Sequence, residues 1–228
     1  MRPPPLLLIL GVLFLLGGLY VAARSLLRLL TTIRASRTYG APYKRGQIAD
    51  RFLGFLMALP LPPCGSFLLV LSLGQAAFQP TAAVGPLKVA DLEAARSGWG
   101  RTTVTLTPDP AYPEHRTLEG SIDGARWAVV GDFLDWAPGV RWLGLVPAHR
   151  VRALAGADDV GGGGTRGQRL VPIDAPPRMA LLLLALDRWL PMLTVREGAT
   201  PWLPQAAKSR AVLYATPDGY LVDQVAIP

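Results

Sequence analysis

Few residues in this chain are of the types that carry out catalysis, and their spacing does not bring them together. The two histidines lie in different segments, His115 in a loop and His149 at the start of an expected strand, and we expect both at the surface. Asp132 and Asp135 are three positions apart in another expected strand, so their side chains point to opposite faces. They could act as a pair only if a β-bulge at Gly131 re-aimed one of them.

Motifs that would bind metals or phosphates are equally weak. Asp158 and Asp159 offer two carboxylates to a hard cation, but no further oxygen ligands follow at a regular spacing. The run Gly161–Gly164 leads into no GKS or GKT sequence, so it predicts a loop and not a phosphate cradle. The one cysteine, Cys64, excludes an internal disulfide and a cysteine-based zinc site. We therefore expect no catalytic, metal-binding or cofactor-binding residue, and we predict that the chain is not an enzyme.

The composition is typical of a membrane protein. Of the 228 residues, 50% are hydrophobic and only 17% are charged, whereas soluble domains average about 25% charged. An uncharged run of 18 residues, Leu6–Ala23, is close to the roughly 20 that cross a bilayer as a helix. A secretory signal peptide is the alternative. It fits less well, because such peptides have an apolar stretch of about 7–15 residues and only Arg2 precedes this one.

A second apolar segment, Phe52–Phe78, has 27 residues without charge but contains three prolines between positions 60 and 63. Proline lacks the backbone N–H and clashes with the preceding turn, so one straight helix is not expected. Either a single span is kinked at the prolines, or the span proper begins near Leu61 with a proline in its first turn. The segment crosses once in both alternatives, and we place this second transmembrane helix at about residues 60–78.

Positive charge is concentrated between the two spans. Residues 24–51 contain seven basic residues and one acidic residue, and short loops of this kind stay in the cytoplasm. We therefore predict a protein of the bacterial inner membrane with both termini and the C-terminal domain in the periplasm. The leucine-rich segment after the first run predicts that its helix continues into the headgroups. Three arginines on that extension are expected to contact anionic lipid at the cytoplasmic face: Arg24, Arg28 and Arg34.

The same distribution argues against nucleic-acid binding. The formal net charge is +7, but residues 82–228 contain 15 basic and 15 acidic residues. A nucleic-acid-binding domain needs its basic surplus on the surface that meets the phosphates. The surplus here belongs entirely to the N-terminal segment, so we expect no nucleic-acid partner.

Beyond the spans the hydrophobic period changes to two, which predicts a β-rich domain. One helix is expected at Pro177–Leu190, and Pro217-Asp218-Gly219 predicts the turn of a C-terminal hairpin. The predicted fold class is membrane-anchored α+β, with a transmembrane helical hairpin in residues 1–81 and a β-rich extracytoplasmic domain with one packed helix in residues 82–228. The expected strands are residues 87–92, 102–106, 127–136, 146–154, 168–173, 211–215 and 220–225.

All six tryptophans lie in this domain, where the residue type serves either as core or as an anchor for a partner. Trp127 and Trp136 are nine positions apart, so they share one face of a strand only if a bulge at Gly131 adds a residue. We expect Trp127 in the core. Trp136, beside a turn, and the nearby Trp142 are the candidate partner contacts.

The segment 124–156 resembles the corresponding stretch of a family of small bacterial membrane proteins often labelled "cation/multidrug efflux pump". The resemblance rests on two tryptophans at the ends of one strand, on Leu143-Gly144-Leu145 and on Arg150. It implies an N-terminal pair of spans and a tail of apolar helix, proline-rich link and final strand pair. It implies no catalytic residues. The glycine run 161–164 and the prolines of the second span depart from the pattern.

These observations lead to a hypothesis of function. We expect a non-catalytic accessory subunit of a larger membrane assembly, such as a photosynthetic reaction centre with its antenna or a respiratory complex. Its partners would be other integral membrane subunits. Small residues that let helices approach closely are candidate contacts: Gly11, Gly17 and Gly18. The alternative is an accessory component of an efflux or envelope-transport system, as the family label suggests.

Overall fold

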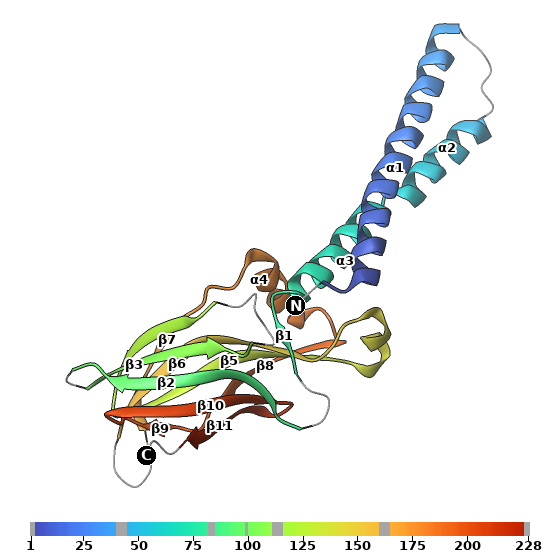
Figure 1. Ribbon diagram of the computed structural model, residues 1–228. Helices are drawn as coiled ribbons and strands as arrows, with labels where there is room; N and C mark the ends of the chain where they lie inside the picture. The colour runs from blue at the N-terminus through green and yellow to red at the C-terminus, as the bar shows by residue number, and fades with distance from the viewer. Residues whose placement is uncertain are drawn as a thin grey trace. The chain divides into compact units, whose positions relative to one another are not determined.

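The computed structural model describes residues 3–39, 45–81, 85–98, 100–110, 116–159 and 165–225. The chain divides into two compact units, a helical one that ends at Gly74 and a β-rich one that begins at Gln75. The fold is therefore α+β, with a long apolar N-terminal helix and a β-rich domain (Figure 1). The division precedes the boundary that we expected after residue 81, because the short strand β1 (Gln79–Pro80) pairs within the domain.

The first helix, α1 (Pro5–Tyr39), contains 35 residues and is therefore about 50 Å long at 1.5 Å per residue. It continues without a break from the apolar run into the basic segment, as the leucine-rich sequence after Arg24 predicts. Its residues 5–35 are long and apolar enough to cross a membrane.

The second apolar segment forms two helices, α2 (Arg45–Ala58) and α3 (Leu61–Gln75), with a two-residue break between them. Pro62 and Pro63 lie in the first turn of α3, where a missing N–H breaks no helical hydrogen bond. With 15 residues, α3 covers only about 22 Å of an apolar core that is about 30 Å thick. Residues 48–75 together are long and apolar enough to cross a membrane, as a kinked span would require. The start of α3 at Leu61, with prolines in its first turn, is the feature of our other alternative.

Glycines allow α1 and α3 to pack closely. A Cβ atom at Gly65 would lie 2.3 Å from the backbone nitrogen of Leu15 and 2.7 Å from the carbonyl oxygen of Gly11. A Cβ atom at Gly18 would lie 2.6 Å from the Cβ of Leu61. No side chain fits at these distances, so the helical hairpin itself requires glycine at these positions.

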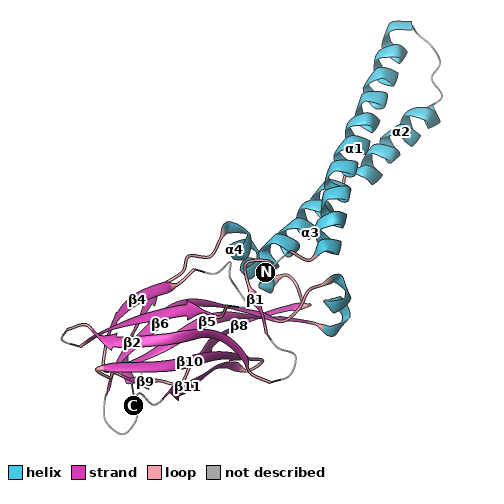
Figure 2. Cartoon of the chain, viewed as in Figure 1, coloured by secondary structure: helices cyan, strands magenta, loops and turns pink. Residues whose placement is uncertain are grey.

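The β-rich domain contains two antiparallel sheets (Figure 2). In the first, the strand order is β1-β6-β5-β8, with β7 also paired to β6 and β9 to β5. Its further strands are β5 (Arg126–Trp136), β6 (Ala148–Asp159), β7 (Thr165–Pro172), β8 (Leu193–Ala199) and β9 (Leu203–Pro204). The second has the order β11-β10-β2-β3-β4. Its strands are β2 (Leu87–Arg96), β3 (Arg101–Pro108), β4 (Leu118–Asp123), β10 (Lys208–Thr216) and β11 (Gly219–Val225).

The hydrophobic core lies between the two sheets. Alternate residues of each strand point inward, so both sheets contribute apolar side chains to one cluster. The first sheet supplies Trp127, Phe133 and Leu154, and the second supplies Leu92 and Leu213, all at most 4% exposed. The domain is thus a β-sandwich whose strands are fixed by burial of one face.

Local sequence signals predict much of this domain. The expected strand pair at residues 87–92 and 102–106 is confirmed as β2 and β3, which are adjacent and antiparallel. The expected C-terminal hairpin is confirmed as well, because β10 and β11 pair up to Thr216 and Gly219 around the turn residues Pro217 and Asp218.

Other elements differ from expectation. The helix expected at Pro177–Leu190 is shorter, with α4 at Arg178–Ala185 followed by a 3-10 turn, η2, at Leu186–Arg188. A second 3-10 helix, η1 (Pro138–Leu143), follows β5, and β4 and β8 were not expected as strands. The sequences of β4 (LEGSID) and β8 (LTVREGA) are polar and glycine-containing, so pairing in the sheet outweighs a weak local preference.

A β-bulge occurs at the expected place but in the other strand. Val130 of β5 pairs with Ala153, and Gly131 pairs with Val151, so the extra residue is Arg152 of β6. The alternation of side chains along β5 is therefore unbroken, and Trp127 and Trp136 lie on opposite faces of the strand. The bulge does not bring the two tryptophans together.

Gln75, the last residue of α3 and the first of the β-rich unit, has a fully buried side chain. Its Oε1 accepts a hydrogen bond of 2.8 Å from the indole Nε1 of Trp136. Its Nε2 donates one of 2.8 Å to the carbonyl of Val146. One buried amide therefore holds the end of β5 and the segment before β6.

This arrangement predicts the effects of three tryptophan substitutions on stability. Trp127→Ala and Trp136→Ala should each destabilise the domain by about 3–5 kcal/mol, because both side chains are only 2% exposed. Trp142→Ala should have little effect, because that side chain is 73% exposed. Thermal melts of the full chain, followed by near-ultraviolet circular dichroism, measure the difference. A Trp136→Ala variant that melts like Trp142→Ala would contradict the buried position of Trp136.

Candidate functional site

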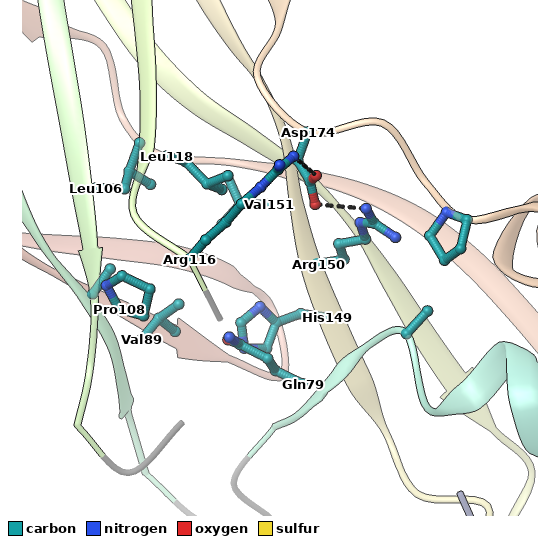
Figure 3. A pocket seen from close by; sticks show the side chains of 13 residues that line it. Gln79, Val89, Leu106, Pro108, Arg116, Leu118, His149, Arg150, Val151 and Asp174 are labelled. Carbon is teal, nitrogen blue, oxygen red and sulfur yellow. Dashed lines mark hydrogen bonds and ion pairs between the residues drawn. The ribbon is translucent and has the colours of Figure 1, made fainter. Parts of the chain in front are cut away.

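A pocket of about 240 Å³ opens at one edge of the sandwich. Strands β2 and β3 form one side and β6 the other, and the chain segments around β1 and before α4 also contribute lining residues (Figure 3). Most of its wall is apolar. The apolar residues that line it include Val89, Ala90, Leu106, Pro108, Leu118 and Val151.

Charged side chains gather at one side of this pocket. The Nη2 of Arg150 donates hydrogen bonds to the Oδ2 of Asp174 at 2.5 Å and to the carbonyl of Ala175 at 2.8 Å. The other oxygen of the same carboxylate, Oδ1, accepts a hydrogen bond of 3.2 Å from Arg116 (Figure 3). Two guanidinium groups thus share one carboxylate, which leaves a formal charge of +1 at the pocket.

His149 lies in the pocket wall and has no exposed surface. Its Nδ1 is 3.1 Å from the hydroxyl of Tyr220, and the two rings meet edge to face. The ring of Phe133 lies 4.8 Å from that of Tyr220, centroid to centroid. Burial, and to a smaller extent the charge of Asp132, raises the pKa of Tyr220 well above its ordinary value, so the hydroxyl stays neutral.

Our expectation of a surface position for His149 is wrong. The residue precedes Arg150 at the start of β6, and pairing with Phe133 of β5 turns its ring toward the core. A local pattern could not reveal this, because the burial depends on the register of two strands. His115, Trp99 and the glycines 161–164 lie outside the residues that the structure describes.

Asp132 belongs to a separate cluster of charges on β5, β6 and β8. Its Oδ1 lies 3.1 Å from Nη1 of Arg152, the bulge residue, whose Nη2 lies 2.6 Å from Glu197. Burial raises the pKa of Asp132, and the charge of Arg152 partly opposes this shift. Asp135 instead pairs with Arg196, so the two aspartates contact different arginines.

The candidate partner contacts occupy different environments. Trp136 is buried against Gln75 within the chain, so it is a core residue and not an exposed contact. Trp142 is exposed. At Gly11 and Gly18, atoms of α3 lie where a Cβ atom would need space. At Gly17, no atom lies within 4 Å of that place.

The candidate headgroup contacts lie on α1 beyond its apolar run. Arg24, Arg28 and Arg34 are all exposed. Nη1 of Arg24 donates a hydrogen bond of 3.2 Å to the hydroxyl of Tyr20, and the carbonyl of Arg28 accepts one of 3.1 Å from Arg51. The three arginines are therefore presented by one continuous helix, as we expected.

Exposed apolar and basic side chains also gather near the point where the chain enters the domain. η1 follows Trp136, and the segment from α4 to Trp189 precedes Leu193, the residue that pairs with Trp136. Figure 1 shows α4 and β1 at the same end of the domain. We call these exposed residues the entry surface: Arg141, Trp142, Arg178, Met179, Leu181, Leu182, Arg188 and Trp189. Asp187 lies in the same segment, and its carboxylate accepts a hydrogen bond from the backbone N–H of Val195.

Among the described residues, no three His, Cys, Asp or Glu side chains are grouped so that they could hold a metal ion. Asp158 is exposed on β6, and Cys64 is exposed on α3. The pocket was not expected from the sequence, because its residues come from distant strands and loops. Arg116, Arg150 and Asp174 become neighbours only once β4, β6 and β7 are in place.

No protein-family model, no curated protein and no solved structure matches this chain.

The environment of Asp132 predicts a pH dependence of stability. Because its pKa in the folded state lies above the ordinary value of 3.8, folding favours the protonated form. The contribution of Asp132 to the free energy of unfolding is therefore largest below pH 3.8. It declines as the pH rises through the pKa of Asp132 in the folded state. Asp132→Asn removes this decline. The melting temperature of the variant relative to the wild type should thus increase between about pH 4 and neutral pH.

Melting curves at a series of pH values test this expectation. Asp135→Asn is a suitable control, because it also removes a carboxylate from β5 but at a side chain that is 40% exposed. A difference between Asp132→Asn and the wild type that stays constant with pH would rule out a raised pKa.

Proposed function

We propose that this chain is a non-catalytic accessory subunit of a larger membrane assembly in the bacterial inner membrane. It would be anchored by α1 and by the kinked segment of α2 and α3, with both termini and the β-rich domain in the periplasm. Its partners would be other integral membrane subunits of an energy-transducing complex, for example a photosynthetic reaction centre with its antenna or a respiratory complex.

One face of α1 carries this proposal. Ile9, Leu13, Leu16 and Tyr20 follow each other at three- and four-residue intervals, and each is at least 58% exposed. Gly17 lies among them and leaves open space where a side chain would be. Lipid alone could cover the apolar side chains of this face. The exposed glycine is more specific, because it lets the backbone of a partner helix approach α1 closely.

The orientation is supported by the basic loop between the spans and by the entry surface. Tryptophan and arginine both favour the zone of lipid headgroups, and the entry surface presents two exposed tryptophans with three arginines. The domain begins at Gln75, the last residue of α3, so it follows directly in sequence on an apolar helix. The entry surface is suited to rest on the bilayer.

The groups around the pocket favour binding over catalysis. Arg116 and Arg150 are held by Asp174, and the hydroxyl of Tyr220 is kept neutral by burial. The hydroxyl of Tyr220 contacts the ring of His149, but both side chains are almost fully buried and Tyr220 is not among the residues that line the pocket, so a bound substrate has little access to this pair. The resemblance to proteins labelled as efflux components suggests a second function, an accessory role in efflux or envelope transport. Deletion of the gene would then cause sensitivity to drugs or ions, whereas loss of a subunit would reduce one membrane complex.

Topology is tested by cysteine labelling in a Cys64→Ser background. Ser97→Cys lies in the domain and should react with a membrane-impermeant maleimide added to intact cells. Ser36→Cys lies in the basic segment and should react only after the membrane is permeabilised. Labelling of Ser36→Cys in intact cells would reverse the proposed orientation.

Co-purification tests the docking face. Gly17→Leu should leave the yield and melting temperature of the chain unchanged, because its position faces open space, yet it should abolish recovery of partner subunits in mild detergent. Gly54→Leu also adds a side chain at an open position, but on α2, and serves as the matched control. A wild-type chain that purifies alone as a monodisperse monomer would refute the subunit proposal. Recovery of the same partners with Gly17→Leu would show that this face of α1 is not the docking surface.

A further inference from the structure

We infer that the pocket between β2, β3 and β6 binds an amphiphile with a short apolar chain and an anionic headgroup. Two sources share this chemistry, a free fatty acid and one acyl chain of an anionic phospholipid. The inference rests on the pocket itself and does not depend on the proposed role as a subunit.

The shape and lining of the pocket suit an apolar chain. Its volume of about 240 Å³ corresponds to roughly eight groups of the size of water or a methylene, at about 30 Å³ each. The side chains of Val89, Leu106 and Val151 present carbon to this space from both sheets. A chain of that length would exchange water for apolar contacts, which is the main source of binding energy in such pockets.

The charges at the pocket select the headgroup. Asp174 uses one carboxylate oxygen for each arginine, so the trio carries a net positive charge that a monoanion would neutralise. A guanidinium has five N–H donors, and the contacts of Arg150 use only those on Nη2. Its Nε and Nη1 have no acceptor among the described residues and can donate to a carboxylate or phosphate oxygen.

The guanidinium of Arg150 is also well placed for strong binding. Its side chain is only 11% exposed, whereas that of Arg116 is 77% exposed. An ion pair formed at a largely buried arginine is screened less by water and salt than one at the surface. We therefore assign the headgroup contact chiefly to Arg150, with Arg116 closing over it from the solvent side.

The chain segments next to the pocket carry apolar side chains that an amphiphile could contact. Pro177 lines the pocket and directly precedes α4, whose residues Leu181 and Leu182 are about half exposed. Ala77 and Gln79, on the segment that follows α3, line it as well. The lining of the pocket is therefore continuous in sequence with the entry surface, and an amphiphile held there by apolar side chains would be close to the arginines.

Photocrosslinking of the full chain in phosphatidylcholine nanodiscs tests the inference. The first probe is a decanoic acid with a terminal diazirine, and the second is phosphatidylglycerol with a diazirine in one acyl chain. Mass spectrometry of the digested protein should locate the label in residues 87–108 and 148–151. The uncharged methyl ester of the first probe should label these strands at least fivefold less.

Variants connect the label to the pocket. Leu118→Trp fills the space from the edge strand β4, and Arg150→Gln removes the charge; each should reduce labelling at least fivefold. Arg101→Gln is the matched control, because Arg101 pairs with Asp123 at an exposed position on β3 and does not line the pocket. Melting curves show which variants remain folded.

The outcomes separate clearly. Labelling by the acid alone supports a free fatty acid as the ligand, and labelling by the lipid probe as well supports the bilayer as a source. Equal labelling by the acid and its ester, or no label in these strands, would overturn the inference. So would undiminished labelling of a folded Leu118→Trp variant. If that variant does not fold, the comparison of acid with ester on the wild-type chain still decides.

Discussion

The side-chain amide of Gln75 is the interaction on which the organisation of the domain depends. It is fully buried, and it uses its oxygen for the indole of Trp136 and its nitrogen for the carbonyl of Val146. A buried polar group that loses its partner costs about 1–3 kcal/mol, so both contacts must persist together. The residue that ends the apolar helix therefore also fixes the two central strands of the first sheet.

The two strands beside these contacts, β5 and β6, are neighbours in the first sheet. With the end of β5 and the approach to β6 held at one residue, the register of these strands places His149 against Phe133 and Tyr220. The bulge at Arg152 takes up the one residue by which β6 exceeds β5 and directs its guanidinium to Asp132 and Glu197. The pocket and the buried charges are thus two consequences of the same pairing.

The sequence predicts those parts of the structure that depend on local chemistry. These parts are the apolar runs, the prolines in the first turn of α3 and the turn at Pro217 and Asp218. Each depends on a few neighbouring residues, so it can be recognised from the sequence alone. The burial of Trp136 and His149 is not, because it depends on which strands pair and in which register. Glycine composition likewise indicates close helix approach, but only the structure shows that Gly18 serves the chain's own hairpin while Gly17 stays open.

Two glycines of the sandwich illustrate how differently positions of one residue type are constrained over evolution. A Cβ atom at Gly131 would lie 2.3 Å from the backbone carbonyl oxygen of Arg150, and no substitution elsewhere can remove a backbone atom. The atoms nearest to a Cβ at Gly120 would instead belong to the side chains of Ile173 and Leu154, at 2.4 Å and 2.8 Å. Descendants of this sequence should therefore keep position 131 invariant, whereas position 120 is free to become alanine in lineages where one of its two neighbours has become smaller.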